Sequence, residues 1–313
     1  MALNPEPKKY YGWRGYKVEV ADVELGVAPG IGGRIISLKL HGEELFFVHP
    51  KYAGETHNLV HTADLRGKKR QLGHRVFGGD KTWLAPQKEW WENVPPLELD
   101  AGPYTSRLVG NSIIMESPVC RETGVRLIRQ VELRETGEIV LRQTMINESL
   151  WEVRRGIWNV TQFLRPFDVY LPTPPNAVQA YPENGDSERW RSAVVAPAGR
   201  WTRIGCHRPA LFKFGAMLDC GMLIALRRRA HETLAMMRLF DVEPQQPYAH
   251  DAMAEVYNSA KYNYFEIEVH APLATLAPGA QCSHTQRWAL KRLPPEIGPE
   301  EVVEAMADCF QGL

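Results

Sequence analysis

The chain has 313 residues, and its 37 lysines and arginines balance its 37 aspartates and glutamates. A formal net charge of zero removes the electrostatic case for nucleic acid or an anionic membrane as its main partner. Hydrophobic residues make up 44% of the chain, enough for a full globular core, and no run of about 18 apolar residues predicts a membrane-spanning segment.

The amino terminus and the cysteines both favour a reducing, intracellular setting. The first nine residues, from Met1 to Lys9, lack the apolar core of a secretory signal, so we expect a cytoplasmic protein unless a leader has been removed. The five cysteines are odd in number, widely spaced and free of any Cys-x-x-Cys pair. We therefore expect reduced thiols.

Short runs that alternate apolar and polar side chains recur along most of the chain, and this period of two predicts β-strands. Turn-forming pairs such as Pro29-Gly30, Thr136-Gly137 and Pro278-Gly279 separate them. Many short strands at regular spacing predict one large all-β, antiparallel sandwich that forms a single domain over residues 1–313, with its core at about 16–291. The predicted strands are, in chain order, Lys17–Leu25, Arg34–Leu40, Leu45–Val48, Ser112–Pro118, Val125–Leu133, Ile139–Ile146, Val153–Phe163, Met222–Leu226, Thr233–Phe240, Tyr264–His270 and Ser283–Lys291.

One short helix is predicted near the carboxyl terminus, at about residues 299–310. Pro299 suits the first helical position, and acidic residues occupy the first turn. Val302, Met306 and Phe310 form an apolar stripe, so the helix is expected to pack on the outside of a sheet. Residues 172–210, by contrast, are rich in Pro, Asn, Gly and Arg and predict long loops.

The segment at residues 74–91 combines three indoles with charged and amide side chains. Gly78-Gly79 allows a tight turn or a close approach of the backbone to a ligand. Indoles on such a loop can stack on the C–H face of a pyranose while polar groups bond its hydroxyls. The alternative is a buried tryptophan cluster that plugs one end of the sandwich. The side chains expected to contact a sugar here are Asp80, Trp83, Gln87 and Trp90.

Three histidines, His57, His61 and His74, lie in or just after the polar segment that begins at residue 55. The spacing of His57 and His61 would suit one face of a helix, but the neighbouring Gly, Thr and Asn residues favour a solvated loop. No His-Glu-x-x-His or Cys/His signature occurs, so we predict no metal site and no cofactor. A nucleophilic serine elbow, a phosphate-binding loop and a dinucleotide fingerprint are also missing from the sequence.

The most informative strand is Tyr264–His270, in which aromatic or aliphatic residues alternate with charged ones. Successive side chains of a strand point to opposite sides, so Glu266, Glu268 and His270 share one face. Two carboxylates and an imidazole on one wall suit proton transfer or recognition of a polar ligand. They also suit a plain solvated strand face, and the sequence pattern by itself leaves both interpretations open.

Four segments resemble the aldose 1-epimerase (galactose mutarotase-like) superfamily, and the likeness is to a divergent branch of it. Gly32–Leu38 is similar to its early strand, and Phe77–Asp80 is similar to its His-Gly-Gly turn. Asn147–Phe163 is similar to its paired strands that end in Asn-His-x-Tyr-Phe, and Ile267–Gly279 is similar to the strand that carries the base glutamate. The resemblance covers most of residues 16–291 and implies a supersandwich of antiparallel sheets.

The resemblance also implies a chemistry. Members of the superfamily interconvert sugar anomers: a glutamate withdraws the proton of the anomeric hydroxyl and a histidine protonates the ring oxygen. Glu268 matches the base, and Asn159 matches the asparagine of the family. Val160 and Phe77 stand where the family has histidines, so either another group supplies the acid or the pocket does not catalyse this reaction. The candidate catalytic residues are Glu268, His74, His61 and Lys81, and further candidate sugar contacts are Asn159, Gln162, Glu266 and His270.

Three functions therefore remain open, and all have a small-molecule sugar or short glycan as partner. The first is an epimerase-like isomerase with Glu268 as base and a relocated acid. The second is a non-catalytic carbohydrate-binding or sensing domain. The third is a lyase-type proton transfer on a sugar acid, with Lys81 or Arg75 holding the carboxylate. The sequence carries no signal for the identity of the sugar or for the oligomeric state.

Overall fold

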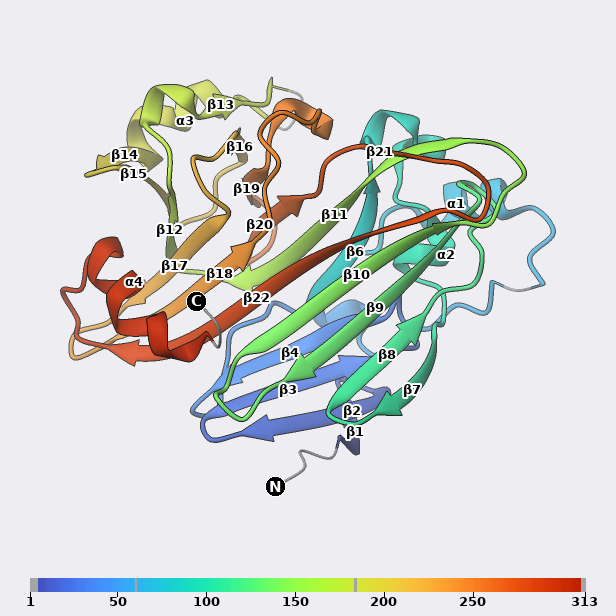
Figure 1. The fold of residues 1–313 in the computed structure, drawn as a ribbon, viewed down its shortest axis with the longest axis horizontal. Coiled ribbons are helices and arrows are strands. Elements are labelled where there is room, and N and C mark those ends of the chain that lie inside the picture. Colours follow the sequence, from blue (N-terminus) through green and yellow to red (C-terminus); the bar gives the residue numbers. More distant parts are fainter. Residues whose placement is uncertain (1–4, 60, 183–184, 311–313) are drawn as a thin grey trace.

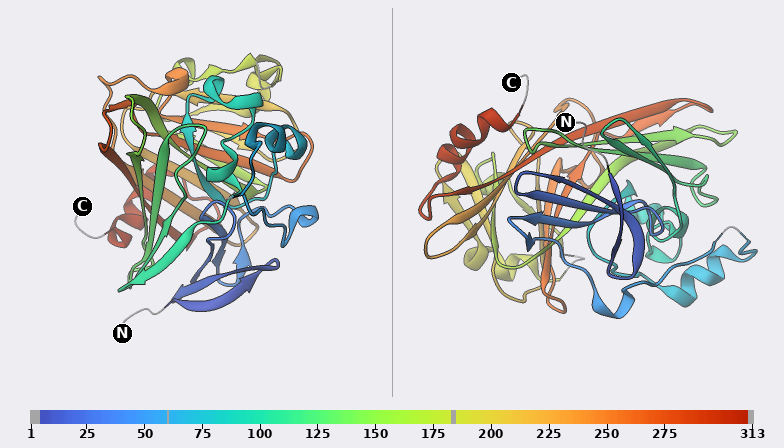
Figure 2. Two further views of the ribbon diagram at one scale, coloured as in Figure 1. Left: turned by 90° about the vertical axis from the view of Figure 1, so that its right-hand side faces the viewer. Right: turned by 90° about the horizontal axis from the view of Figure 1, so that it is seen from below.

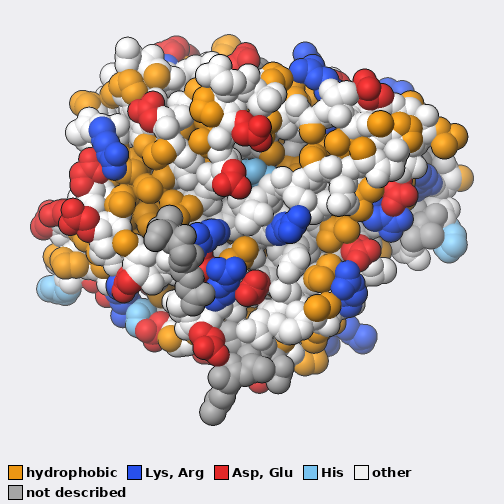
Figure 3. Space-filling view, in the orientation of Figure 1, with side chains coloured by type: hydrophobic (Ala, Val, Ile, Leu, Met, Phe, Trp, Pro, Cys, Tyr) orange, Lys and Arg blue, Asp and Glu red, His pale blue; other side chains and the backbone are white. Residues whose placement is uncertain are grey.

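Two large antiparallel sheets pack face to face in the computed structural model, which describes residues 5–59, 61–182 and 185–310 (Figure 1). Figure 2 shows the sandwich from two further directions. The predicted all-β sandwich is confirmed. The face of the molecule in Figure 3 intersperses acidic and basic side chains, as expected for a chain without net charge.

Within the described residues the larger sheet has 12 strands, ordered β1-β2-β3-β4-β6-β11-β20-β19-β16-β13, with β5 paired to β4 and β21 paired to β11. Its strands are β1 (Glu6–Tyr10), β2 (Trp13–Val20), β3 (Val23–Ala28), β4 (Arg34–Leu40), β5 (Glu43–Glu44), β6 (Asp80–Ala85), β11 (Val153–Leu164), β13 (Gln179–Ala180), β16 (Phe212–Ala216), β19 (Ala254–Asn258), β20 (Tyr264–His270) and β21 (Ala274–Leu276).

The smaller sheet has 10 strands in the same described ranges, ordered β14-β15-β12-β17-β18-β22-β10-β9-β8-β7. Its strands are β7 (Thr105–Val109), β8 (Ser112–Glu116), β9 (Val125–Leu133), β10 (Ile139–Asn147), β12 (Phe167–Leu171), β14 (Val195–Ala198), β15 (Trp201–Cys206), β17 (Met222–Arg228), β18 (Thr233–Phe240) and β22 (Gln281–Leu293).

The main hydrophobic core lies between the sheets and follows from the period of two. In β20, Phe265, Ile267 and Val269 belong to this core and are 1% exposed or less. Burying an aliphatic or aromatic side chain of this kind contributes about 1.5–3 kcal/mol each. The alternate residues of β20 therefore have to face the other side of the larger sheet, where the candidate site lies.

The carboxyl-terminal helix is confirmed. Helix α4 (Pro299–Met306) is continued by the 3₁₀ turn η7 (Ala307–Cys309). Val302, Met306 and Phe310 pack against the outer face of the smaller sheet, as the apolar stripe predicted. The other helical segments are α1 (Leu65–Leu72), α2 (Leu97–Asp100), α3 (Ser187–Val194), η1 (Pro50–Tyr52), η2 (Gln87–Glu89), η3 (Trp91–Asn93), η4 (Pro175–Ala177) and η6 (Ala249–Asp251). No helix in the described ranges has the length and apolar character needed to cross a membrane.

Several local predictions were wrong. Residues 172–210 contain α3, β14 and β15 rather than long loops, and the side chain of Asp186 caps α3 by accepting a hydrogen bond from the amide of Arg189. His57 and His61 lie outside any helix, as predicted, but helix α1 follows them and is capped in the same way by Asp64. An aspartate directly before a helical run is a signal for the start of a helix, and Asp64 and Asp186 both provide it.

Two predicted strands also differ from the structure. The run Lys17–Leu25 is divided between β2 and β3 by a tight turn, in which Ala21 has a positive φ of 48°. Leu45–Val48 forms isolated bridges to Phe163 and Gly78 instead of a strand. Tertiary pairing, rather than the local pattern, sets the ends of such short segments.

Candidate functional site

Five neighbouring strands of the larger sheet, β6, β11, β20, β19 and β16, carry the candidate site on the face turned away from the smaller sheet. Val160 on β11 pairs with Lys81 on β6 and with Glu268 on β20, and Glu268 pairs with Glu255 on β19. Residues opposite each other in antiparallel strands share a face of the sheet. The register therefore aligns these four side chains in one row, although the chain separates them widely.

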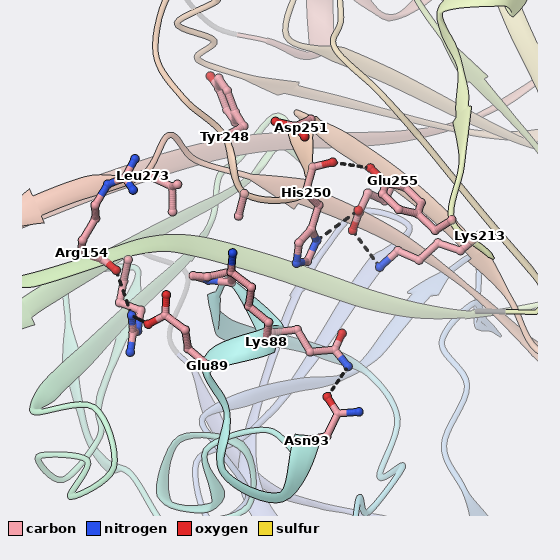
Figure 4. Close-up of a pocket in the computed structure, with 15 residues that line it drawn as sticks. Lys88, Glu89, Asn93, Arg154, Lys213, Tyr248, His250, Asp251, Glu255 and Leu273 are labelled. Atoms are coloured by element: carbon pink, nitrogen blue, oxygen red, sulfur yellow. Dashed lines mark hydrogen bonds and ion pairs between the residues drawn. The ribbon is translucent and has the colours of Figure 1, made fainter. Parts of the chain in front are cut away.

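Two hollows open over this row. The larger has a volume of about 880 Å³ and the smaller about 170 Å³, and Lys213 on β16 lines both of them. In Figure 4, Lys213 and His250 point toward Glu255 at the side of the larger hollow. Among their charged and aromatic lining residues, the larger hollow has Tyr181, His250 and Glu255, and the smaller has His74, Trp83, Trp90, Trp158, Glu266 and Glu268.

Lys213 connects two buried carboxyl groups. Its Nζ lies 2.8 Å from Oε2 of Glu255 and 3.0 Å from Oε2 of Glu268. The indole Nε1 of Trp158 also donates to Oε2 of Glu268, at 2.9 Å. Glu255 and Glu268 are 1% exposed or less, so this ammonium and these hydrogen bonds replace the water that the carboxyl groups have lost.

Two imidazoles complete the cluster. Nδ1 of His250 lies 3.2 Å from Oε1 of Glu255, and Nε2 of His270 lies 2.9 Å from its Oε2. His270 is fully buried, whereas His250 is half-buried at the wall of the larger hollow. Glu255 is thus the centre of the cluster, and each of its oxygens faces a histidine.

The environment pushes the pKa values of the two carboxyl groups apart. Burial raises the pKa of Glu268 well above its usual range, and the neighbouring Glu255 and Glu266 carboxylates add to this effect against the opposing Lys213. Burial by itself would raise the pKa of Glu255 too, but Lys213 and His270 outweigh it and hold that pKa well below its usual range. Carboxyl pairs whose pKa values diverge in this way are typical of acid/base sites.

A second polar group lies beside this cluster. Nζ of Lys81 is 3.1 Å from Oε1 of Glu266, and Nε2 of Gln162 donates to the same oxygen at 2.7 Å. Lys81 also lies over the Trp83 ring, 4.7 Å from its centroid. Burial lowers the pKa of Lys81 despite the attraction of Glu266. The sequence predicted Lys81, Gln162 and Glu266 for one site, and the structure brings them together.

The tryptophans form a packed wall rather than an open one. Trp83, Trp90 and Trp158 are 7% exposed or less, and the Trp90 and Trp158 rings stack with centroids 5.5 Å apart. Nε1 of Trp90 donates to the carbonyl of Leu84 at 2.7 Å, which fixes its orientation. Of the two interpretations open from the sequence, the structure is closer to the buried cluster, although indole surface still lines the smaller hollow.

The remaining predicted residues divide between this face and other parts of the molecule. His74 keeps exposed surface within the smaller hollow, and desolvation by the surrounding protein lowers its pKa. His61 is exposed near the start of α1 and lines neither hollow. Phe77 is buried against Trp13 in a separate hydrophobic cluster and lines neither hollow. Gln87 lines both hollows at their edge.

Asp80 and Asn159 face the interior of the sandwich, not the site. Asp80 forms an ion pair with Arg129 of the smaller sheet, and its Oδ2 accepts from Nδ2 of Asn159 at 2.8 Å and from Oγ1 of Thr161 at 2.6 Å. Because neighbours in a strand alternate faces, Asp80 and Lys81 cannot both face the hollows. The expected sugar contacts of Asp80 and Asn159 are therefore replaced by internal structural contacts. Arg75, the other predicted carboxylate partner, pairs with Glu55 and lines neither hollow.

Sequence reasoning missed Lys213, His250 and Glu255. Glu255 and Lys213 lie in short alternating runs, Ala254–Asn258 and Phe212–Ala216, so the period-two signal used for other strands could have found them. His250 lies in the 3₁₀ turn η6 with a positive φ of 60°, and the sequence has no comparable signal for it.

Comparison with known proteins gives similarity at the level of fold. No protein-family model matches the chain, and no curated protein is similar to it in sequence. Solved structures, however, match nearly its whole length. The Slr1438 protein from Synechocystis sp. PCC 6803 has a TM-score of 0.58 at 11% identity, over 95% of this chain and 99% of that one.

Two further structures have names that refer to galactose mutarotase or to aldose 1-epimerase. A galactose mutarotase-like protein from Clostridium acetobutylicum has a TM-score of 0.53 at 11% identity, over 93% of this chain and 99% of that one. A candidate aldose 1-epimerase from Escherichia coli K12 has a TM-score of 0.52 at 12% identity, over 89% and 99%. The resemblance expected from the sequence is thus confirmed for the fold, and this chain has the galactose mutarotase-like supersandwich.

Proposed function

We propose that this protein binds a monosaccharide or short glycan over β11, β20, β19 and β16 and acts on it by proton transfer, as an epimerase-type isomerase. The observation that carries the proposal is the pair of buried carboxyl groups, Glu255 and Glu268, joined by Lys213 where the two hollows adjoin. The fold, which galactose mutarotase-like proteins share, supports a carbohydrate ligand but does not by itself define the reaction.

The size and chemistry of the larger hollow suit such a ligand. Its volume of about 880 Å³ falls within the range of about 300–1,000 Å³ that small-molecule pockets occupy. Its wall offers an ammonium, an imidazole, a phenol and amide groups, which can bond sugar hydroxyls as donors or acceptors. Leu273 and Ala249 supply apolar surface for the C–H faces of a sugar ring.

In the proposed reaction the ionised form of Glu268 accepts the proton of the anomeric hydroxyl. It lies on the strand position that the sequence resemblance assigns to the base, and it lines the smaller hollow next to Lys213. His74 lines the same hollow and is the group best placed to deliver a proton to the ring oxygen. Lys81 is already engaged by Glu266, and His61 is too far toward the surface, so neither is preferred as the acid.

Exchange between sugar anomers tests this proposal directly. Saturation-transfer NMR or polarimetry over a panel of neutral and acidic aldoses should show faster anomer exchange with the protein than without it. Because a positioned proton-transfer group supplies about 10²–10⁴-fold, Glu268→Gln should lower the rate by at least about 100-fold. Glu122→Gln is the matched control, since Glu122 is also a buried carboxyl paired with a lysine, Lys69, but lies outside both hollows. Equal activity of wild type and Glu268→Gln would remove Glu268 as the base.

A second candidate, carbohydrate binding without catalysis, is favoured by one specific observation. Glu268 is 1% exposed and accepts a hydrogen bond from the indole of Trp158, and the smaller hollow that it lines has a volume of only about 170 Å³. A sugar in the larger hollow could then bind without reaching Glu268. Ligand-observed NMR that detects binding, together with an unchanged anomer exchange rate for the bound sugar, would select this function.

A further inference from the structure

We infer that His250, Glu255 and His270 form a binding site for a first-row divalent metal ion of the zinc type, at the side of the larger hollow. One nitrogen from each histidine and one carboxylate oxygen all lie within 4.8 Å of one another. Two histidines and one carboxylate are a recurrent ligand set of catalytic zinc, and imidazole nitrogen with carboxylate oxygen suits first-row ions in general. This site was not predicted from the sequence, where only His57, His61 and His74 were candidate metal ligands.

The separations within the cluster fit a coordination shell. Ligand atoms bound at about 2.1 Å are about 3.0–3.4 Å apart when they subtend 90–109° at the ion. Glu255 presents a different oxygen to each histidine: Oε1 lies 3.2 Å from Nδ1 of His250, within this range, and Oε2 lies 2.9 Å from Nε2 of His270, just below it. Nδ1 of His250 and Nε2 of His270 both face the Glu255 carboxylate, and the two rings meet at an angle of 75° with centroids 5.1 Å apart. Small side-chain shifts would therefore convert these hydrogen bonds into coordination.

His250 is held in place by a built turn. His250 and Asp251 both have positive φ values, 60° and 51°, which are uncommon for residues other than glycine. The hydroxyl of Tyr181 donates to the carbonyl of His250 at 2.7 Å, and Nε2 of Gln179 donates to it at 3.0 Å. Backbone strain that the surrounding contacts maintain is typical of functional positions, and here it directs an imidazole at a buried carboxylate.

The charge of the cluster favours a cation. Glu255 and Glu268 share the single ammonium of Lys213, and a bound cation would supply a second positive charge for the two carboxyl groups. Lys213 competes for the same carboxylate, because its Nζ lies 2.8 Å from Oε2 of Glu255. His250 approaches the other oxygen, Oε1, from the side of the larger hollow, where solvent or a ligand could occupy the remaining coordination positions. Such an open position would let the ion polarise a sugar oxygen. This role rests on the proposed function, whereas the binding of the metal does not depend on it.

Metal titration of the chelator-treated full chain, without sugar, tests the site. Zn²⁺ in a calorimeter and Co²⁺ followed by its visible absorption should each show one ion bound per chain. His250→Ala and Glu255→Gln should each weaken binding by about 100-fold or more, because each removes a ligand. Should Glu255→Gln fail to fold, His250→Ala still decides, since His250 is half-buried at the wall of the hollow. His207→Ala is the matched control: it removes a histidine that faces Asp168 at 3.0 Å on the surface, and it should change nothing.

Lys213→Met makes the sharpest discrimination. Removal of a competing ammonium should strengthen binding by about tenfold or more, whereas loss of a merely structural contact would weaken or not change it. Absence of binding in both wild type and Lys213→Met, or undiminished binding in His250→Ala, would overturn the site. Because no sugar is present in this experiment, its failure is distinguishable from failure of the proposed function.

Discussion

Replacing Asp80 by asparagine should destabilise the fold without weakening ligand binding. Asp80 is fully buried, and its two oxygens accept hydrogen bonds from Arg129, Asn159 and Thr161. Asparagine has nearly the same shape, but it carries no negative charge. Its NH₂ group would also face side chains that donate hydrogen bonds and would have no acceptor there. A buried ion pair that loses one partner costs about 3–5 kcal/mol, because the remaining charge is uncompensated. With about 2.1 cal/mol/K of unfolding entropy per residue over 313 residues, the expected fall in Tm is about 5–8 °C.

Calorimetry and urea unfolding measure this effect, and two companion variants interpret it. Arg129→Met in the Asp80→Asn background should recover more than half of the lost stability, because it removes the unpaired guanidinium. Asp308→Asn, which breaks an exposed pair with Lys291, should cost no more than about 1 kcal/mol. A loss below about 1 kcal/mol in Asp80→Asn would refute the reasoning. If Asp80→Asn instead lost sugar binding while its stability stayed unchanged, Asp80 would be a sugar contact, as the sequence predicted.

The remaining predictions concern buried titratable and aromatic groups. Burial lowers the pKa of His284 to about 4 in the folded protein. Below pH 6.5 the unfolded chain therefore binds more protons than the folded chain, so the free energy of unfolding falls as the pH drops. The loss reaches roughly 3 kcal/mol near pH 4. His284→Leu should therefore flatten the decline in urea stability between pH 7 and 5 relative to wild type, and an unchanged slope would contradict this. Lys69→Met should lower the free energy of unfolding in urea by about 3–5 kcal/mol, because it leaves the Glu122 carboxylate unpaired. A second change, Glu122→Leu, should recover most of this loss. Additive losses in the double variant would argue against coupling of the two side chains. Trp90→Ala should cost about 3–5 kcal/mol and enlarge the smaller hollow, which unfolding and a crystal structure would check; a loss under 1 kcal/mol would mean that Trp90 does not pack as described.

Local periodicity was enough to predict much of the fold and part of the site. Alternation along Tyr264–His270 places Glu266, Glu268 and His270 on one face in any packed sheet, because a strand has a fixed period of two. The same reasoning predicted strands such as Val125–Leu133 with their observed ends, and Pro299 with its apolar stripe predicted the terminal helix. These features depend on residues that are neighbours in the chain, so the sequence alone determines them.

Only the tertiary structure decided which groups meet. Lys213 reaches Glu268 across 55 residues of chain, and it does so because β16 and β20 both pair with β19 in the larger sheet. Asp80 belongs to the interior because Arg129, from the other sheet, lies opposite it. Sheet pairing and sheet packing join segments that are far apart in sequence, and no local pattern records the partner of a strand or the depth of a hollow. The carboxylate strand could therefore be predicted from the chain, whereas the contacts of Lys213 and His250 with the buried carboxyl groups could not.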